Sequence, residues 1–350
     1  MILMGGIKHD LIVGRPINIS PTDRIERPAM IDRLRGTKTR LIEGIDFRVV
    51  RLDASNVASN KKKVKEQGKV EGEKLFQGML KLLQDNFPAS EIENEAQYRR
   101  YFYDRYSANW FVDVAVGNDG KVIGASLYSY CQDVNLVMHN IVVVDKDHRL
   151  GRVADSLMSR AVLNSNIRAR ETVGQDAEYV MGEIERIDPS IDGEEGRMRN
   201  VIRPTFHDNI SRIRAIQTTD GEPLEYLLPI MATDQERQEA AAQGEPFEPE
   251  SLMFCLRPLI RDEKAGIGSK ETAKLLIWFY RDYLEAECSD IKPQKSRYLL
   301  AVTLAKLAPK ANVERLEELL QSKRNDAKVI ELIPDVQLSF MKVSETTPNQ

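Results

Sequence analysis

The stretch I-V-V-V-D-K-D-H-R-L-G-R-V-A-D-S-L-M, residues 141–158, decides the fold that this sequence predicts. Its first four residues complete a mainly apolar stretch over 136–144, interrupted by His139 and Asn140, which predicts a strand. A polar turn ends the run, and apolar residues then return at helical spacing, as at Val153 and Leu157. The stretch therefore predicts a strand, a basic turn and a helix over 150–163.

The turn has the chemistry of an anion site. Backbone N–H groups converge at the start of a helix, where they suit a diphosphate. The helix dipole adds about 0.3–1 kcal/mol of preference for negative charge. Arginine side chains add positive charge and can bind phosphate oxygens with two hydrogen bonds. We therefore expect a diphosphate on the turn formed by Arg149, Leu150, Gly151, Arg152, Val153 and Ala154.

Periodicity and turn residues predict the elements on either side. Helices and strands follow one another along the chain, and the end of the chain is mainly helical. The predicted strands are 41–51, 110–116, 121–130 (joined to the previous one by the hairpin Asn118-Asp119-Gly120), 136–144, 177–187, 224–228, 252–256, 329–333 and 338–341. The predicted helices are 75–83, 91–106, 150–163, 200–215 and three apolar stripes that begin at Ser269, Tyr298 and Val313.

This order of elements, with the motif at 141–158, resembles the GNAT superfamily of acyl-CoA-dependent N-acyltransferases. The family's turn has the form Arg/Gln-x-x-Gly-x-Gly/Ala. Counting from Arg149 puts Arg152 at the glycine and Ala154 at the small residue, whereas counting from His148 puts Gly151 at the glycine. We prefer the Arg149 register because it keeps the arginine and the apolar spacing of the helix. The resemblance implies an α/β (α+β) fold with a mixed central sheet flanked by helices.

The resemblance also implies a co-substrate and residues that bind it. Acetyl-CoA or a longer acyl-CoA would be the donor, with no metal. The backbone of Val142, Val143 and Val144 would hydrogen-bond the pantetheine arm. Phe206-His207 stands where the family often has Phe-Tyr, so His207 would take the place of the tyrosine that protonates the leaving thiolate.

Transfer to an amine also requires a base for the ammonium proton. Strand periodicity puts Glu183 and Glu185 on one face of 177–187, and Glu183 is preferred because it lies deeper in the strand. His139 is the alternative base, since an imidazole accepts a proton near neutral pH. For each of these residues a purely structural role remains open. Asn140 is a candidate for binding the acceptor or the pantetheine amides.

Other features have simpler readings. Cys131 as a nucleophile would need an adjacent base, and none is near it in the sequence. The basic run over 61–74 is read as a solvated loop or helix entry, with a polyanion patch as the alternative. The cluster Trp278-Phe279-Tyr280 is read as core, with a hydrophobic partner surface as the alternative.

Composition narrows the class of protein. The chain has 350 residues, with 50 Lys+Arg against 54 Asp+Glu and a formal net charge of −4. This balance gives no support for a nucleic-acid partner. Three widely spaced cysteines form neither a disulfide framework nor a zinc motif, which favours a reducing cytoplasm. No apolar run is long enough for a membrane span, and homo-oligomerisation stays open.

We expect three regions. Residues 1–44 would be an N-terminal extension that is disordered in part, 45–260 the GNAT-like acyl-CoA-binding domain, and 261–350 a helical C-terminal module with a frayed tail. The expected function is transfer of an acyl group to an amine on a peptide, a protein or a specialised metabolite. The alternative is a catalytically degenerate GNAT scaffold that binds acyl-CoA or a protein partner, since Arg152 and His207 depart from the family pattern.

Overall fold

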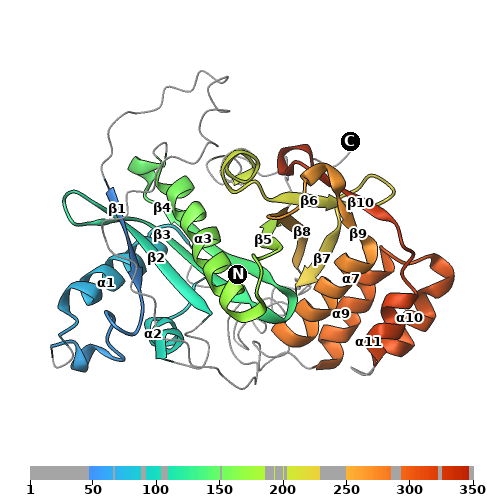
Figure 1. Cartoon of the computed structure of the whole chain (residues 1–350), viewed down its shortest axis with the longest axis horizontal. Coiled ribbons are helices and arrows are strands. Elements are labelled where there is room, and N and C mark those ends of the chain that lie inside the picture. The colour runs from blue at the N-terminus through green and yellow to red at the C-terminus, as the bar shows by residue number, and fades with distance from the viewer. Residues whose placement is uncertain are drawn as a thin grey trace. The chain divides into compact units, whose positions relative to one another are not determined.

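The structure is a computed structural model that forms two compact units (Figure 1). We call residues 9–128 and 141–163 the first unit, and residues 1–8, 129–140 and 164–350 the second unit. Strands β3 and β4 and helix α3 run through both. The structure describes residues 47–65, 68–87, 92–103, 109–149, 152–185, 193, 200, 203–228, 250–284, 293–321 and 325–346.

The first unit contains a sheet of neighbouring strands in the order β1-β2-β3-β4. Strands β1 and β2 pair antiparallel from Phe47↔Gly117 to Leu52↔Val112. The predicted hairpin between β2 and β3 is present, and Gly120 adopts the left-handed conformation, with φ of 78°. The strands are β1 (Phe47–Leu52), β2 (Trp110–Gly117), β3 (Val122–Cys131) and β4 (Leu136–Val144).

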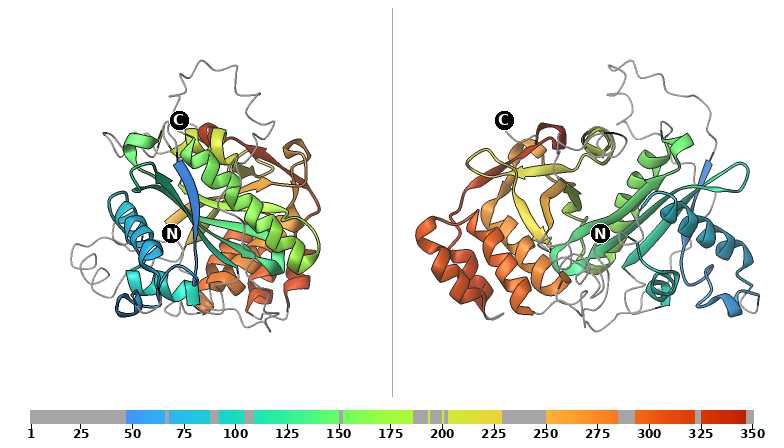
Figure 2. Two further views of the ribbon diagram at one scale, coloured as in Figure 1. Left: turned by 60° about the vertical axis from the view of Figure 1, so that its left-hand side comes forward. Right: turned by 180° about the vertical axis from the view of Figure 1, so that it is seen from behind.

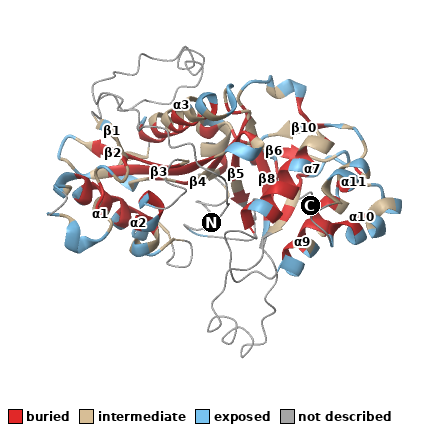
Figure 3. Ribbon diagram, turned by 60° about the horizontal axis from the view of Figure 1, so that its bottom comes forward, coloured by how far each residue is buried: buried red, intermediate tan, exposed pale blue. Residues whose placement is uncertain are grey.

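Helices cover both faces of these strands. In the first unit, α1 and α2 lie on one face and the first half of α3 lies on the other (Figure 3). A core of Ala115, Ile123, Val153 and Leu157 joins α3 to the strands. The helices are α1 (Val70–Gln84), α2 (Glu95–Tyr103) and α3 (Val153–Val173), so α3 runs ten residues beyond the predicted end at 163.

Gly124 allows α3 to approach β3 closely. A Cβ atom at this position would lie 2.6 Å from Val153 Cγ1, 3.1 Å from Leu157 Cδ1 and 3.3 Å from the Val143 carbonyl oxygen. Val153 is β-branched and fully buried, so it has little freedom to move away.

We predict that Gly124→Ala lowers the free energy of unfolding by about 1–3 kcal/mol, because the added methyl group overpacks this contact. Urea denaturation measures the change. Gly268→Ala is the control, since its Cβ would meet no heavy atom closer than 4.0 Å, and it should change the free energy by less than about 0.5 kcal/mol. Equal effects of the two substitutions would show that the approach of α3 is not constrained.

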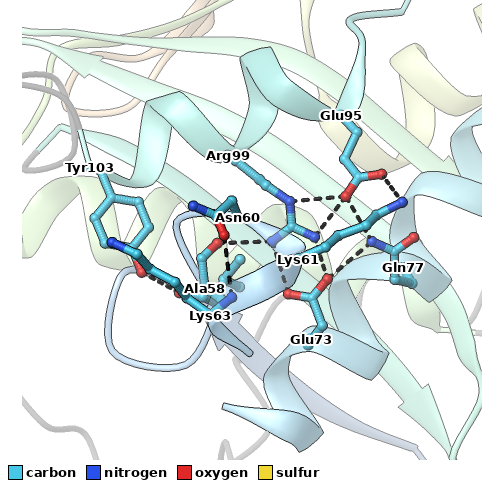
Figure 4. Close-up of polar contacts among 10 residues, drawn as sticks. Ala58, Asn60, Lys61, Lys63, Glu73, Gln77, Glu95, Arg99 and Tyr103 are labelled. Carbon is cyan, nitrogen blue, oxygen red and sulfur yellow. Dashed lines mark hydrogen bonds and ion pairs between the residues drawn. The ribbon is translucent and has the colours of Figure 1, made fainter. Parts of the chain in front are cut away.

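A buried ionic cluster holds α1 and α2 together (Figure 4). Arg99 Nη1 donates to Glu73 Oε2 at 2.9 Å and to the Ala58 carbonyl oxygen at 2.8 Å, and Nε donates to Glu95 Oε1 at 2.9 Å. Lys61 pairs with the other oxygen of Glu95 at 2.7 Å. Within the basic run 61–74, Lys61 therefore pairs with a carboxylate of the same chain. This pairing supports the interpretation of the run as a loop or helix entry.

We predict that Arg99→Met costs about 3–5 kcal/mol of unfolding free energy, because it leaves the carboxylate of Glu73 buried without its charge partner. The double substitution Arg99→Met with Glu73→Met should recover much of that loss, since neither charge then remains buried. Chemical denaturation of the two single variants and the double variant gives the coupling free energy. Strict additivity would contradict the role of the cluster.

The second unit continues from β4 in the order β4-β5-β8-β6-β10-β9, with β7 also paired to β8. β4 and β5 pair in parallel, whereas β8 pairs antiparallel with β5, β6 and β7, and β10 pairs antiparallel with β6, so the predicted mixed sheet is confirmed. The strands are β5 (Tyr179–Glu185), β6 (Arg214–Gln217), β7 (Glu225–Leu228), β8 (Glu250–Pro258), β9 (Ile267–Gly268) and β10 (Gln337–Met341).

The C-terminal helices gather beside these strands (Figure 2). Phe279 packs edge-on against Tyr226 of β7, with ring centroids 5.2 Å apart, and Tyr280 donates to the Leu227 carbonyl oxygen at 2.6 Å. Trp278, Phe279 and Tyr280 are all buried, as the core reading predicted. The helices are α5 (Arg203–Phe206), α7 (Ser269–Trp278), α9 (Pro293–Ala305), α10 (Val313–Leu320) and α11 (Asp326–Glu331), and π-helical turns follow α5 and α7.

Several predicted boundaries differ from the structure. Residues 329–333 are not a strand, because α11 covers most of them and buries Val329. The helix predicted over 200–215 ends at Ser211, since Arg212 adopts a left-handed conformation and β6 follows. In the second unit, β10 returns from the end of the chain to pair with β6, and the boundary expected near residue 261 stays a prediction. Residues 1–44 lie outside the described residues.

Among the described residues, no helix is long and apolar enough to cross a membrane.

Candidate acyl-transfer site

The turn before α3 is built as a helix entry. Asp145 accepts a hydrogen bond from the Asp147 N–H at 3.0 Å, which caps a short 3₁₀ turn over Lys146–His148. The Arg152 carbonyl accepts from the Ser156 N–H at 2.9 Å, so the helix proper begins at Val153. The first N–H groups of a helix have no acceptor within it. Leu150 and Gly151 lie outside the described residues.

The two arginines of the turn have different surroundings. Arg149 is partly buried, and its guanidinium donates to Asn86 Oδ1 at 2.8 Å and to the Val144 carbonyl oxygen at 3.3 Å. Arg152 is exposed, whereas Val153 and Ala154 turn inward and are buried. The structure therefore gives Arg149 a part in holding the turn and leaves the side chain of Arg152 at the surface.

In the second unit, the parallel pairing of β4 and β5 is short. It joins Leu136 to Tyr179, Val137 to Val180 and Met138 to Met181. β4 continues to Val144 and β5 to Glu185. Within the described residues, both strands therefore extend beyond the last residue pair that joins them. On its other edge β5 stays paired with β8 through Glu185. His139, Asn140 and Glu183 thus follow the point where the ladder ends.

Strand periodicity divides these residues between two faces of the sheet. Paired residues of a parallel ladder point the same way, and directions alternate along each strand. Glu183 therefore shares a face with Met181, and Asn140 shares that face through Met138. His139 and Gly182 belong to the opposite face, where a Cβ on Gly182 would meet Ile213 Cδ1 at 2.9 Å. The candidate residues Glu183 and His139 are thus on opposite faces.

The structure brings the two candidate histidines together. Burial lowers the pKa of His139 to about 4. Burial, and after it the electrostatic influence of the nearby His139, lowers the pKa of His207 to about 3. The Nδ1 atom of His207 lies 3.2 Å from Ser211 Oγ, and the ring packs edge-on against Phe206. Both imidazoles are therefore neutral at neutral pH, and their N–H groups can donate hydrogen bonds.

Glu183 has a partner that the sequence analysis did not identify. The hydroxyl of Tyr226 donates to Glu183 Oε1 at 2.7 Å. Tyr226 is fully buried and packs edge-on against Phe254 and Phe279. Burial raises the pKa of the phenol well above its usual value, so the phenol stays protonated as a donor. The predicted strand 224–228 already placed an aromatic hydroxyl in the sheet, but only the fold puts it beside β5.

We predict that the stability of the protein falls as pH decreases from about 6.5 toward about 4. The folded protein holds His139 and His207 neutral, whereas the unfolded chain binds their protons from about pH 6.5 downward. Urea denaturation at pH 7.5, 6 and 5 tests this expectation. His139→Gln should flatten the dependence.

His148→Gln is the matched control, because this imidazole lies beside Asp145 on the first unit, with its Nδ1 atom 3.1 Å from the carboxylate. It should leave the loss of stability between pH 6.5 and 5 in place. An unchanged pH slope in His139→Gln would contradict the proposed cause.

Comparisons with known proteins found similar solved structures. A scan against protein-family models and a search of curated protein sequences found no match. Similar solved structures include nourseothricin acetyltransferase, with 16% identity and a TM-score of 0.27 over 43% of this chain. This chain spans 65% of the length of that protein.

Two further structures carry the GNAT name. The GNAT-family acetyltransferase of Staphylococcus aureus is 12% identical, with a TM-score of 0.32 over 61% of this chain and 99% of that one. The phosphinothricin acetyltransferase of Sinorhizobium meliloti, in complex with AcCoA, is 14% identical, with a TM-score of 0.32 over 53% of this chain and 83% of that one. These names agree with the family that the sequence resembles.

Proposed function

We propose that this protein transfers an acyl group from acetyl-CoA or a longer acyl-CoA to an amine. The observation that carries the proposal is the early end of the β4–β5 ladder at Met138↔Met181, with a carboxylate and an imidazole just beyond it. Backbone groups at such an edge have no ladder partner and can bind an extended amide-containing arm. A free amine on a peptide, a protein or a specialised metabolite is the proposed acceptor.

The donor would bind through β4 and the turn that follows it. Val142, Val143 and Val144 would offer main-chain groups to the pantetheine arm. The diphosphate would lie on the turn from Arg149 to Ala154, where the start of α3 has N–H groups without helical acceptors. Arg152 stands where the family motif has its glycine, and its exposed guanidinium supplies a positive charge there instead.

The chemistry follows from the two faces of the sheet. Glu183 takes the proton of the acceptor ammonium, directly or through water, and the freed nitrogen attacks the thioester carbon. The C–S bond then breaks, and its electron pair goes to sulfur. The nitrogen loses its second proton to this thiolate, so the products are an amide and a free thiol. On the other face, His207 is neutral, so it stabilises the thiolate through an N–H hydrogen bond more readily than through proton transfer from an imidazolium. His139 is the alternative base, with a basicity reduced by burial.

The compartment proposed is the cytoplasm. Cys131 and Cys255 are free thiols, which suits a reducing environment. A degenerate scaffold that binds acyl-CoA without turnover is the second candidate, and Arg152 in the motif is the observation that favours it. Thiol release from acetyl-, butyryl- and palmitoyl-CoA with a panel of amines separates the two, and calorimetric titration with the same donors tests binding.

We predict that Arg152→Ala weakens the binding of CoA, because it removes an exposed guanidinium from the proposed diphosphate site. Adding Arg149→Ala should weaken binding further by loosening the turn that Arg149 holds to Asn86. Isothermal titration calorimetry gives both affinities. The surface variant Arg48→Ala is the control and should bind CoA as the wild type does. An unchanged affinity in the double variant would contradict the diphosphate site on this turn.

We predict that Glu183→Gln lowers kcat by about 10²–10⁴-fold while CoA affinity is retained, because the variant lacks the base. Tyr226→Phe should move the acidic limb of the pH–rate profile to higher pH, since the carboxylate loses a hydrogen bond that favours its ionised form. Steady-state kinetics from pH 5 to 9 measures both. If Glu183→Gln is fully active and His139→Gln is inactive, His139 is the base.

A further inference from the structure

Asn140 carries a buried donor that the fold leaves unused. Its Nδ2 atom is inaccessible to solvent and has no hydrogen-bond partner among the described residues. A buried polar group without a partner costs about 1–3 kcal/mol, and most buried polar groups in native proteins are paired. An unpaired amide donor at this position therefore calls for an acceptor that the described residues do not supply.

The place of Asn140 indicates which acceptor this is. It stands two residues beyond the last ladder pair on β4, and Glu183 stands two residues beyond that pair on β5. Both residues belong to the face that Met138 and Met181 share. The ladder register, carried two residues further, puts Asn140 and Glu183 at matching positions on neighbouring strands. A hydrogen-bond donor and a carboxylate thus lie on the same face, each two residues beyond the last ladder pair.

The two groups are complementary to the two polar atoms of the reacting centre. A carboxylate accepts a proton and so suits the amine nitrogen, whereas the Nδ2 of an asparagine only donates and so suits an oxygen. When the nitrogen bonds to the thioester carbon, the carbonyl π electrons move to the oxygen, which becomes negatively charged. When the C–S bond breaks, the carbonyl re-forms and sulfur takes the electron pair. The oxygen therefore needs a donor when the nitrogen attacks, the step that follows proton transfer to Glu183.

We propose that the side-chain amide of Asn140 binds the acyl oxygen and stabilises its negative charge in the tetrahedral intermediate. This inference rests on the proposed acyl transfer and adds the residue that would polarise the thioester. Donors aimed at an oxygen where charge develops act most strongly in the transition state. Asn140 is then a catalytic residue, because its amide touches the reacting carbonyl group.

Asn140→Leu tests the proposal, because leucine is of similar size and lacks the donor. We expect kcat to fall by about 10²–10³-fold with little change in the KM for the amine. The unfolding free energy of the variant should equal or exceed that of the wild type, since no satisfied hydrogen bond is removed. A structural role for Asn140 predicts the reverse, a loss of stability with activity retained. Asn140→Ala gives the same comparison with a smaller side chain.

Asn135→Leu is the control for a paired asparagine. Its Nδ2 donates to the Asp176 carbonyl oxygen at 2.9 Å and its Oδ1 accepts from the Tyr130 hydroxyl at 2.8 Å. This variant should lose stability, in contrast to Asn140→Leu. A matching loss in both variants would overturn the proposal, because Asn140 would then be structurally bonded as well.

A binding experiment tests the contact without turnover. S-acetonyl-CoA retains a carbonyl but has no thioester to cleave, whereas S-propyl-CoA has no carbonyl. The wild type should prefer the acetonyl compound by about 3–10-fold, the effect of one hydrogen bond, and Asn140→Leu should lose the preference. Equal preference in the two proteins would overturn the inference.

The outcomes separate the inference from the function on which it rests. An active wild type with near-normal kcat in Asn140→Leu removes the role of Asn140 and leaves acyl transfer standing. A wild type that releases no thiol with any amine removes acyl transfer. In that case the two CoA analogues still decide whether Asn140 binds an acyl oxygen.

Discussion

The candidate site depends on the length of one parallel ladder. β4 and β5 share only three residue pairs, while the antiparallel ladder between β5 and β8 runs over seven, from Tyr179↔Pro258 to Glu185↔Leu252. β8 therefore keeps β5 extended after β4 has stopped pairing with it. Polar backbone groups at the open edge need other partners. The same constraint positions Asn140 and Glu183, because their faces follow from the last pair.

The two faces of the sheet differ in electrostatics. On one face, Glu183 is held by a buried phenol whose ring packs among Phe254 and Phe279. On the other, burial lowers the pKa of both His139 and His207 and so disfavours the charged form of each, and the nearby His139 lowers the pKa of His207 as well. A base for the ammonium and a neutral donor for the thiolate are two environments that acyl transfer to an amine requires. Because they lie on opposite faces of the sheet, each group has its own surroundings.

The C-terminal helices contribute to this arrangement through β7. Tyr280 bonds both polar groups of Leu227, donating to its carbonyl oxygen and accepting from its N–H. Phe279 packs on Tyr226, the residue that donates to Glu183. β10 comes back from the end of the chain to pair with β6. The helices are therefore part of the scaffold that orients the carboxylate, which explains why the compact unit does not end before them.

The sequence by itself determined the elements whose period is local. The strand over 136–144, the hairpin at Asn118-Asp119-Gly120 and the start of α3 follow from alternation, turn chemistry and helical spacing, which act between residues close in the chain. The sequence also showed Phe206 next to His207 and indicated Glu183 and His139 as candidate bases. Only the tertiary structure decided that Tyr226 bonds Glu183, that His139 lies near His207, and that the Nδ2 atom of Asn140 has no partner among the described residues. Such facts depend on strand register and on contacts across dozens of residues, such as the 43 between Glu183 and Tyr226, and no local pattern encodes them.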